Sequence, residues 1–383
     1  MRIGRQAHVR LTCQLMKNKQ SLSTSDVRAE QATNTQPEAI YLGVDLHKAS
    51  ITLTRIIDHS TPQPAQTLRW DQFWAFAQKQ ITLAQKVYTC YEAGAFGFWV
   101  ARQLKALGIE CYVVHPEKLD PQHKRVQTDK LDSRHLADKL QRYVLGNKRA
   151  MVPVYIPTEA EEQERLESRH RRSLHEQLRS LQRRGASLLL SQGIFQTHGW
   201  WREAAWQKLQ SQICPQLREA LEDDRALMAD LDQRLKRVEK QLKDSAPKEL
   251  PKGFGRLTFV LLLREICTYQ RFKSRRNVGG FTGLCGGVSR SADYHVDLSI
   301  NKAGSGFLRM ELVELAWRMT YWQPQYTGLK VWNRLKAHGA VASKRRRKTA
   351  IVAVARQLAV DIWKWQTGQV TPEQLGWQMD LAA

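Results

Sequence analysis

The chain from residue 39 to residue 150 carries the hydrophobic patterns of both strands and helices. Short segments that are either continuously apolar or alternating predict strands at residues 40–45, 50–57, 67–70, 86–91 and 111–114. Longer segments with apolar residues at helical spacing predict helices at residues 71–80, 96–107 and 130–144. The resulting order, β-β-β-α-β-α-β-α, predicts a mixed sheet with packed helices, as in RuvC and other ribonuclease-H-like domains.

The middle of the chain is strongly charged but keeps a regular stripe of leucines. Residues 158–190 and 217–242 both show this near-heptad spacing, which predicts two long helices paired in a coiled-coil hairpin. Residues 185–215 contain several Gly and Trp residues and are expected to form a small insertion at the hairpin tip. Beyond residue 247, helical segments surround a polar stretch with short β character at residues 288–300, so this region is expected to be mostly helical.

These patterns divide the chain into five parts, and the fold class is α/β followed by α. The first part is expected to be a flexible basic tail, because Gln, Ser, Thr and Asn dominate it without periodicity. In chain order we expect the basic tail at 1–38, the RuvC-like domain at 39–150, the helical hairpin with its insertion at 151–246, the C-terminal domain at 247–370 and a short tail at 371–383.

The charge balance indicates the kind of partner that the protein binds. The chain carries 60 Lys and Arg residues against 37 Asp and Glu residues, a formal net charge of +23. This excess favours a polyanion, most commonly nucleic acid. Two basic clusters are candidate phosphate contacts: Arg271, Lys273, Arg275, Arg276, Lys344, Arg345, Arg346, Arg347 and Lys348. The alternative is that they are solvated surface or loop residues. Trp200 and Trp201 are candidates for stacking on unpaired bases.

The chain contains no segment that predicts a membrane span or a secretory signal. A spanning helix needs roughly 20 consecutive apolar residues, and the longest dense apolar run, residues 257–263, is much shorter. The six cysteines are scattered and none forms a C-x-x-C pair, which argues against structural zinc and a disulfide framework. We therefore expect a cytoplasmic protein that does not bind membranes.

Four acidic residues stand where a sheet of this kind would gather them. Asp45 and Glu92 end two predicted strands, while Asp129 and Asp132 begin the third predicted helix and share one of its faces. Four carboxylates close together repel one another unless cations neutralise them, and oxygen ligands suit Mg²⁺ or Mn²⁺. Such a site can assist phosphodiester cleavage. The alternative for each acid is a helix cap or a solvated charge.

Several short motifs occur in a characteristic order along the chain. Residues 41–45 read Y-L-G-V-D, residues 91–94 read Y-E-A-G and residues 128–133 read T-D-K-L-D-S. After the predicted hairpin, residues 280–284 read G-F-T-G-L and residues 299–304 read S-I-N-K-A-G. With these motifs in this order, the chain resembles the DEDD transposases of the insertion sequence 110 family, including its 1111 branch.

The resemblance implies a nucleophilic serine in the C-terminal transposase domain. In the family this serine lies between the last two motifs, and counting forward from Gly283 and Leu284 places it at Ser291. Ala292 follows where the family usually has Gly, so Ser289 is the alternative. A second departure is Ser133, which stands where the family writes Ala.

The resemblance also implies a reaction and a set of partners. Members of the family are described as bridge-RNA-guided recombinases, in which one RNA pairs with both target and donor DNA. By this resemblance, the four acids hold Mg²⁺ or Mn²⁺, the serine forms a covalent phosphoserine–DNA intermediate, and strand exchange and religation follow. It further implies a homodimer that assembles into a tetramer, in the bacterial cytoplasm and associated with the nucleoid.

Two other functions remain open from the residues alone. The chain could be a RuvC-like endonuclease that resolves DNA junctions with the four acids and metal-activated water. It could also be a nucleic-acid-binding protein without catalytic activity. Replacement of Ser291 separates the recombinase from the endonuclease, because only the recombinase needs that hydroxyl.

Overall fold

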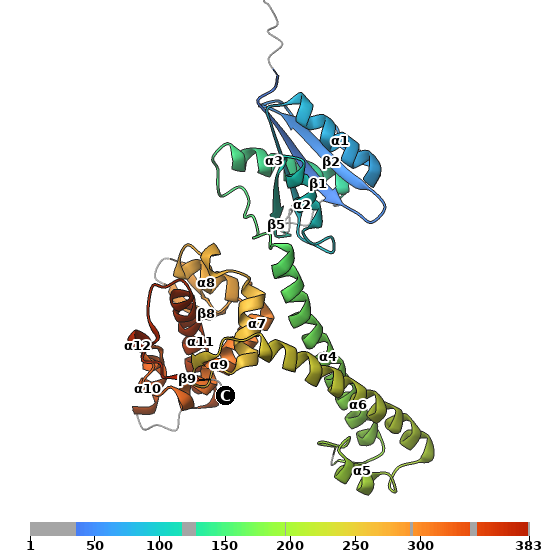
Figure 1. The fold of residues 1–383 in the computed structure, drawn as a ribbon, viewed down its shortest axis with the longest axis vertical. Helices are drawn as coiled ribbons and strands as arrows, with labels where there is room; N and C mark the ends of the chain where they lie inside the picture. Colours follow the sequence, from blue (N-terminus) through green and yellow to red (C-terminus); the bar gives the residue numbers. More distant parts are fainter. Residues whose placement is uncertain (1–35, 117–127, 196, 292–293, 338–342, 382–383) are drawn as a thin grey trace, which may run out of the picture. The chain divides into compact units, whose positions relative to one another are not determined.

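The computed structural model describes residues 36–116, 128–195, 197–291, 294–337 and 343–381 (Figure 1). Almost all of the predicted basic tail, residues 1–38, lies outside these ranges. The chain forms two compact units that divide between Ile156 and Pro157. Among the helices that the structure describes, none is long and apolar enough to cross a membrane.

The N-terminal unit is built on a five-stranded sheet in the order β3-β2-β1-β4-β5. Neighbouring strands are antiparallel from β3 to β1 and parallel from β1 to β5. The sheet is therefore mixed, as the hydrophobic pattern predicts. The strands are β1 (Ala39–Leu46), β2 (Ile51–Ile57), β3 (Gln66–Leu68), β4 (Lys86–Glu92) and β5 (Glu110–Val114).

Helices cover both faces of this sheet, and the alternation along β1 decides which residues meet them. Ile40, Leu42 and Val44 share one core with residues of α1 (Trp70–Leu83) and α2 (Trp99–Ala106). The intervening residues of β1 face the opposite side, where Tyr41 shares a core with Leu136 and Leu140 of α3. Helix α3 comprises Asp129–Val144.

Helix α3 lies unusually close to β1 because residue 43 is a glycine. A Cβ atom on Gly43 would lie 2.1 Å from the carbonyl oxygen of Ser133 and 2.2 Å from the backbone nitrogen of Ala137. Ser133 itself is fully buried, and its hydroxyl lies 3.0 Å from the Thr54 hydroxyl on β2. The serine that departs from the family motif thus joins the start of α3 to the sheet.

The second unit begins with the predicted helical hairpin, formed by α4 (Glu159–Ser191) and α6 (Pro215–Asp244). Arg171 on α4 pairs with Glu239 on α6 at 2.6 Å. The short helix α5 (Glu203–Leu209) belongs to the tip, at the far end of the hairpin from α7 in Figure 1.

The tip of the hairpin is a small hydrophobic core and does not present Trp200 to solvent. Trp200 is 0% exposed, and its indole nitrogen donates a hydrogen bond to the Gln182 carbonyl at 2.9 Å. Gly185 makes room for the ring, because a Cβ there would lie 2.0 Å from it. The expectation that Trp200 stacks on a base is therefore wrong.

The rest of the second unit is mostly helical, as predicted, around one large core. The polar stretch 288–300 belongs to a two-stranded antiparallel hairpin. The elements are β6 (Glu249–Pro251), α7 (Arg256–Ile266), a 3₁₀ turn (Tyr269–Arg271), α8 (Arg275–Thr282), β7 (Gly286–Ser291), β8 (Tyr294–Ile300), α9 (Gly306–Trp322), a second 3₁₀ turn (Thr327–Leu329), α10 (Lys330–Ala337), α11 (Lys344–Gln366), α12 (Pro372–Leu375) and β9 (Met379–Leu381).

Two expectations about the second unit need correction. Leu235 and Leu242 of α6 share a hydrophobic cluster with Val260 of α7 and Phe307 of α9, so the hairpin base and the C-terminal region form one body. The predicted tail at 371–383 is wrong for residues 371–381, because β9 pairs with β6 and Trp377 is buried in the core. These contacts join segments far apart in the sequence, which local patterns do not reveal.

Candidate functional site

The ends of two parallel strands bring the first two predicted acids to the same edge of the sheet. Val44 on β1 pairs with Tyr91 on β4, so Asp45 and Glu92 are the next residues on neighbouring strands. Each acid lies two residues after a strand residue that faces α3. Gly43 touches that helix, and the Cys90 thiol donates a hydrogen bond to the Leu136 carbonyl at 3.4 Å. Asp45 and Glu92 therefore lie on the face of the sheet that α3 covers.

The other two acids are held by the start of α3. Thr128 caps the helix, with its hydroxyl accepting a hydrogen bond from the Leu131 backbone nitrogen at 3.4 Å. Asp129 and Asp132 occupy the first turn, where negative charge is favourable because the backbone N–H groups point outward. The close packing at Gly43 fixes this turn against β1.

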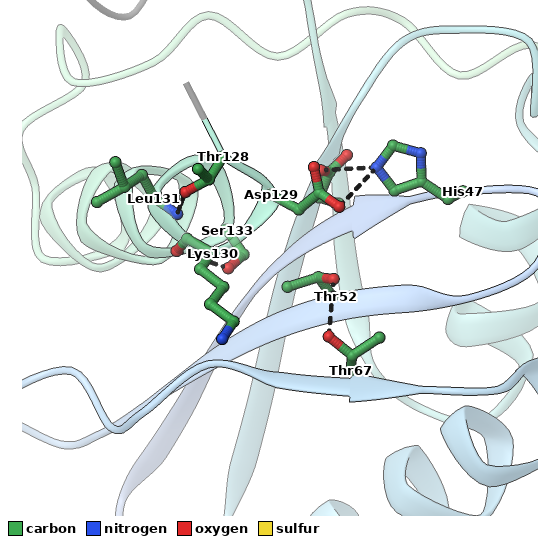
Figure 2. Close-up of polar contacts among 9 residues, drawn as sticks. His47, Thr52, Thr67, Thr128, Asp129, Lys130, Leu131 and Ser133 are labelled. Atoms are coloured by element: carbon green, nitrogen blue, oxygen red, sulfur yellow. Dashed lines mark hydrogen bonds and ion pairs between the residues drawn. The ribbon is translucent and has the colours of Figure 1, made fainter. Parts of the chain in front are cut away.

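An imidazole that the sequence did not single out lies between two of these carboxylates. The Nε2 atom of His47 is 3.2 Å from Oδ2 of Asp45 and 3.4 Å from Oδ2 of Asp129 (Figure 2). Each of the three residues offers one ligand atom, and all three atoms lie within 4.8 Å of one another. The only signal in the sequence is the position of His47, two residues after Asp45 in the turn that leaves β1.

Asp132 lies three residues after Asp129 in the first turn of α3, on the same face of the helix. Its pKa is raised from the ordinary value of 3.8, chiefly by burial and then by the negative charge of Asp45, with a smaller contribution from Asp129. Glu92 is half-buried on the adjacent strand. The structure thus brings together Asp45, Asp129 and Asp132, adds His47, and places Glu92 at the same edge of the sheet.

The donor set at this edge fits a divalent cation. Carboxylate oxygens are the ligands that Mg²⁺ and Mn²⁺ prefer, and an imidazole nitrogen is a common ligand for transition metals. Burial is the main cause of the raised pKa of Asp132, and a cation here would offset the second cause, the negative charge of Asp45. Asp45, His47 and Asp129 are the residues placed to hold it.

The predicted nucleophile lies at the end of strand β7. Ser291 pairs with Tyr294 and Ser289 pairs with Val296 across the β7–β8 hairpin. The side chains of both serines, and all of Ala292, lie outside the part of the chain that the structure describes. The choice between Ser291 and Ser289 therefore stays a prediction.

A basic cleft of about 770 Å³ lies in the second unit, between α8, the β7–β8 hairpin and α11. Three of its lining residues, Arg275, Arg276 and Lys348, belong to the predicted phosphate contacts. Two more cations, Arg356 and Lys364, also line it and were not predicted. They follow Lys348 at intervals of eight residues along α11.

The remaining predicted basic residues are not gathered in this cleft. Arg271 packs its guanidinium over the Phe281 ring at 4.5 Å and donates to the Ile266 carbonyl, which indicates a packing role. Arg345 and Arg346 line a different cavity of about 450 Å³. The others are exposed at the surface: Lys273, Lys344 and Arg347.

Comparison with known proteins shows that this chain is similar to transposases. Residues 250–329 match the model of the transposase IS116/IS110/IS902 family. Two proteins of Sinorhizobium fredii named as transposases, y4rJ and y4qE, are 28% and 29% identical to this chain, over 74% and 75% of its length and 77% of theirs. The transposase for insertion sequence element IS1533 of Leptospira borgpetersenii is 25% identical over 64% of this chain and 75% of its own.

Proposed function

From its similarity to transposases of the IS116/IS110/IS902 family, we propose that this protein is the transposase of an insertion sequence, which cleaves and rejoins DNA. The similarity extends over about three quarters of the chain, well beyond the segment that matches the family model. The observation that carries the proposal is the cluster of Asp45, His47 and Asp129 at one edge of the sheet, with Asp132 in the same first turn of α3 as Asp129. Such a cluster is suited to phosphodiester chemistry.

The N-terminal unit acts as a RuvC-like DEDD domain in this proposal. The strand order β3-β2-β1-β4-β5, with an antiparallel half and a parallel half, supports it. So does the position of Asp45 and Glu92 at the ends of adjacent parallel strands. Asp129 and Asp132 complete the four acids from the first turn of α3.

Asp45, Asp129 and His47 would hold a divalent cation, Mg²⁺ or Mn²⁺, with Asp132 and Glu92 beside them. When bound, the cation supplies Lewis-acid polarisation of the scissile phosphate. The chain's own contribution is rigid positioning, because the backbone contact at Gly43 holds the two acid-bearing segments together. The carboxylates also keep the local charge negative, so that a cation is retained in an otherwise basic protein.

Ser291 is the proposed nucleophile, in the domain that matches the family model. Its hydroxyl oxygen attacks the scissile phosphorus and loses its proton to solvent, while the bond from phosphorus to the 3′ oxygen breaks and that oxygen takes up a proton. The products are a 5′-phosphoserine ester and a free 3′-hydroxyl. In strand exchange, a 3′-hydroxyl attacks the ester and displaces the serine, so no external energy source is needed.

A bridge RNA and a tetramer complete the proposal. The net charge of +23 suits a protein that holds nucleic-acid backbones. An RNA that pairs with target and donor would read the sequence, as in other guided enzymes. Two homodimers would then bring two pairs of strands together for exchange.

The decisive experiment is to trap the covalent intermediate. Full-length protein, the flanking non-coding RNA of its element, Mg²⁺ and end-labelled DNA from the element junction are combined and resolved on a denaturing gel. We expect a labelled protein–DNA adduct that disappears in Ser291→Ala and persists in Ser289→Ala. Asp71, an exposed acid on α1, provides the matched control for the acidic site, so Asp71→Asn should keep the adduct and Asp45→Asn should lose it.

Two outcomes would overturn the proposal. If Ser291→Ala still cuts DNA at an unchanged rate and no variant forms an adduct, the reaction uses water, and the protein is an endonuclease. If Asp45→Asn changes nothing, the acidic cluster has no catalytic role.

A further inference from the structure

The basic cleft in the second unit has a composition that general surface charge does not explain. Its rim carries the cations Arg275, Arg276, Lys348, Arg356 and Lys364, and no acid is among its described lining residues. None of these five cations forms an ion pair within the described residues. Five cations around one hollow, none of them in an ion pair within the described residues, make a strongly positive site.

The cleft is also lined by apolar side chains, which we call its floor. They come from the segment after α8, from β8 and from α11: Leu284, Leu298, Ile300, Val352, Ala353 and Val360. Leu298 is 53% exposed, so part of this floor is open to solvent. A site for inorganic anions alone would have no use for such a floor.

The rim cations of α11 are spaced along the length of the cleft. Lys348, Arg356 and Lys364 follow one another at eight-residue intervals, which places them about 12 Å apart along the helix axis. A ligand that meets all three must be extended and must carry several negative charges. Arg275 and Arg276, in the first turn of α8, supply positive charge from a second element of the cleft.

We propose that this cleft binds a single strand of DNA, with its phosphates on the five cations and its exposed bases and sugars against the apolar floor. A duplex keeps its bases inside, so it would gain nothing from the floor. The cleft is also lined by Gly286 and Ile300 at the base of the β7–β8 hairpin, and Ser291 lies at the turn end of the same hairpin. Resting on the proposed function, we assign it to the strand that this serine cleaves, which is why DNA rather than RNA is the expected ligand.

The test compares binding of fluorescein-labelled single-stranded DNA, the corresponding duplex and RNA of the same sequence to the full-length protein by fluorescence anisotropy. The Arg356→Gln/Lys364→Gln double variant should bind single-stranded DNA about tenfold more weakly, because two charge-assisted contacts are lost. The dependence of log K on log salt should become shallower by about 1.4, the value for two phosphates of a single strand. Binding of duplex DNA should change by less than about threefold.

Two further variants make the result specific to the cleft. Lys240→Gln/Lys243→Gln removes the same charge from exposed positions of α6 and should leave single-strand binding within about twofold of wild type. Leu298→Gln keeps the charge but makes the floor polar, so it should weaken single-strand binding and spare the duplex. Circular dichroism melts confirm that each variant is folded.

The possible outcomes separate this inference from the proposed function. Equal losses for single-stranded and duplex DNA, no loss at all, or a loss confined to RNA would overturn the cleft assignment. The cleft assignment would also be overturned if the double variant formed the covalent adduct as fast as wild type at every DNA concentration. Failure of wild-type protein to form any adduct would instead overturn the serine mechanism, while leaving the binding result intact.

Discussion

The acidic cluster of the N-terminal unit and the basic cleft of the second unit are assembled in opposite ways. Backbone topology makes the cluster, because parallel strand ends and a helix start supply Asp45 and Asp129 within reach of His47. Packing of separate elements makes the cleft, because Lys348, Arg356 and Lys364 of α11 line it together with Arg275 and Arg276 of α8. The comparison teaches that strand ends and a helix start gather the acids at one point, whereas the cations of the cleft are spread along α8 and α11.

The largest expected difference between the two regions is in catalysis. Asp45→Asn should reduce the rate of DNA cleavage by about 10³-fold, because the neutral amide no longer holds a cation. Its single-strand affinity should stay within about twofold of wild type. Initial cleavage rates and anisotropy titrations measure the two effects on the same preparation. Loss of binding and cleavage together would show that the two regions are not functionally separate.

Next in size is the effect of filling the gap between β1 and α3. Gly43→Ala should lower the free energy of unfolding by about 3 kcal/mol, since the added methyl meets backbone atoms that cannot rotate away. Urea denaturation followed by circular dichroism measures it. Gly94→Ala is the matched control, because a Cβ there contacts only one atom, at 4.0 Å. Equal stability of the two variants would mean that α3 can shift without cost.

His47 provides a smaller test of whether it belongs to the metal site. His47→Ala should weaken Mn²⁺ binding by about tenfold or more, because one of three donor residues is removed. Electron paramagnetic resonance of free Mn²⁺ gives the affinity without any reference to activity. His59→Ala, at an exposed histidine after β2, should leave it unchanged. If His47→Ala binds Mn²⁺ with unaltered affinity, His47 is not a metal ligand and only hydrogen-bonds to the two acids.

The smallest effect concerns a buried acid on the same helix as the cleft. The pKa of Asp361 is raised from its ordinary 3.8 by burial, although the Tyr326 hydroxyl and the Gln357 amide donate to its carboxylate at 2.7 and 2.9 Å. The folded state therefore binds a proton more tightly than the unfolded chain, and stability falls as pH rises from about 4 through the folded-state pKa.

Asp361→Asn should abolish that decline, so its stability relative to wild type should increase with pH across this window. Urea midpoints at intervals from pH 4 to pH 7 measure the difference. The expectation would be contradicted if the urea midpoints of wild type and Asp361→Asn changed with pH in parallel.

The contrast between the two regions also explains what the sequence could predict. The sequence allowed the four acids to be predicted, because each stands at a strand end or a helix start that the local pattern reveals: Asp45, Glu92, Asp129 and Asp132. His47 was missed, since an exposed histidine in a turn has no pattern of its own. Arg356 and Lys364 line a cleft only because α8 and the β7–β8 hairpin pack beside α11, which the local sequence does not show. The pairing of β9 with β6 joins segments some 130 residues apart, so local sequence patterns do not predict it either.

That last pairing has a consequence for how the C-terminal region can be rearranged. Strand β6 follows directly after the helical hairpin, and its partner β9 lies at residues 379–381, so the entry and exit of this region are neighbours. Neighbouring ends are the condition under which circular permutation and insertion of a domain succeed. The region from residue 249 to residue 381 thus has neighbouring ends, and it could be opened at another loop while its contacts with the base of the helical hairpin are kept.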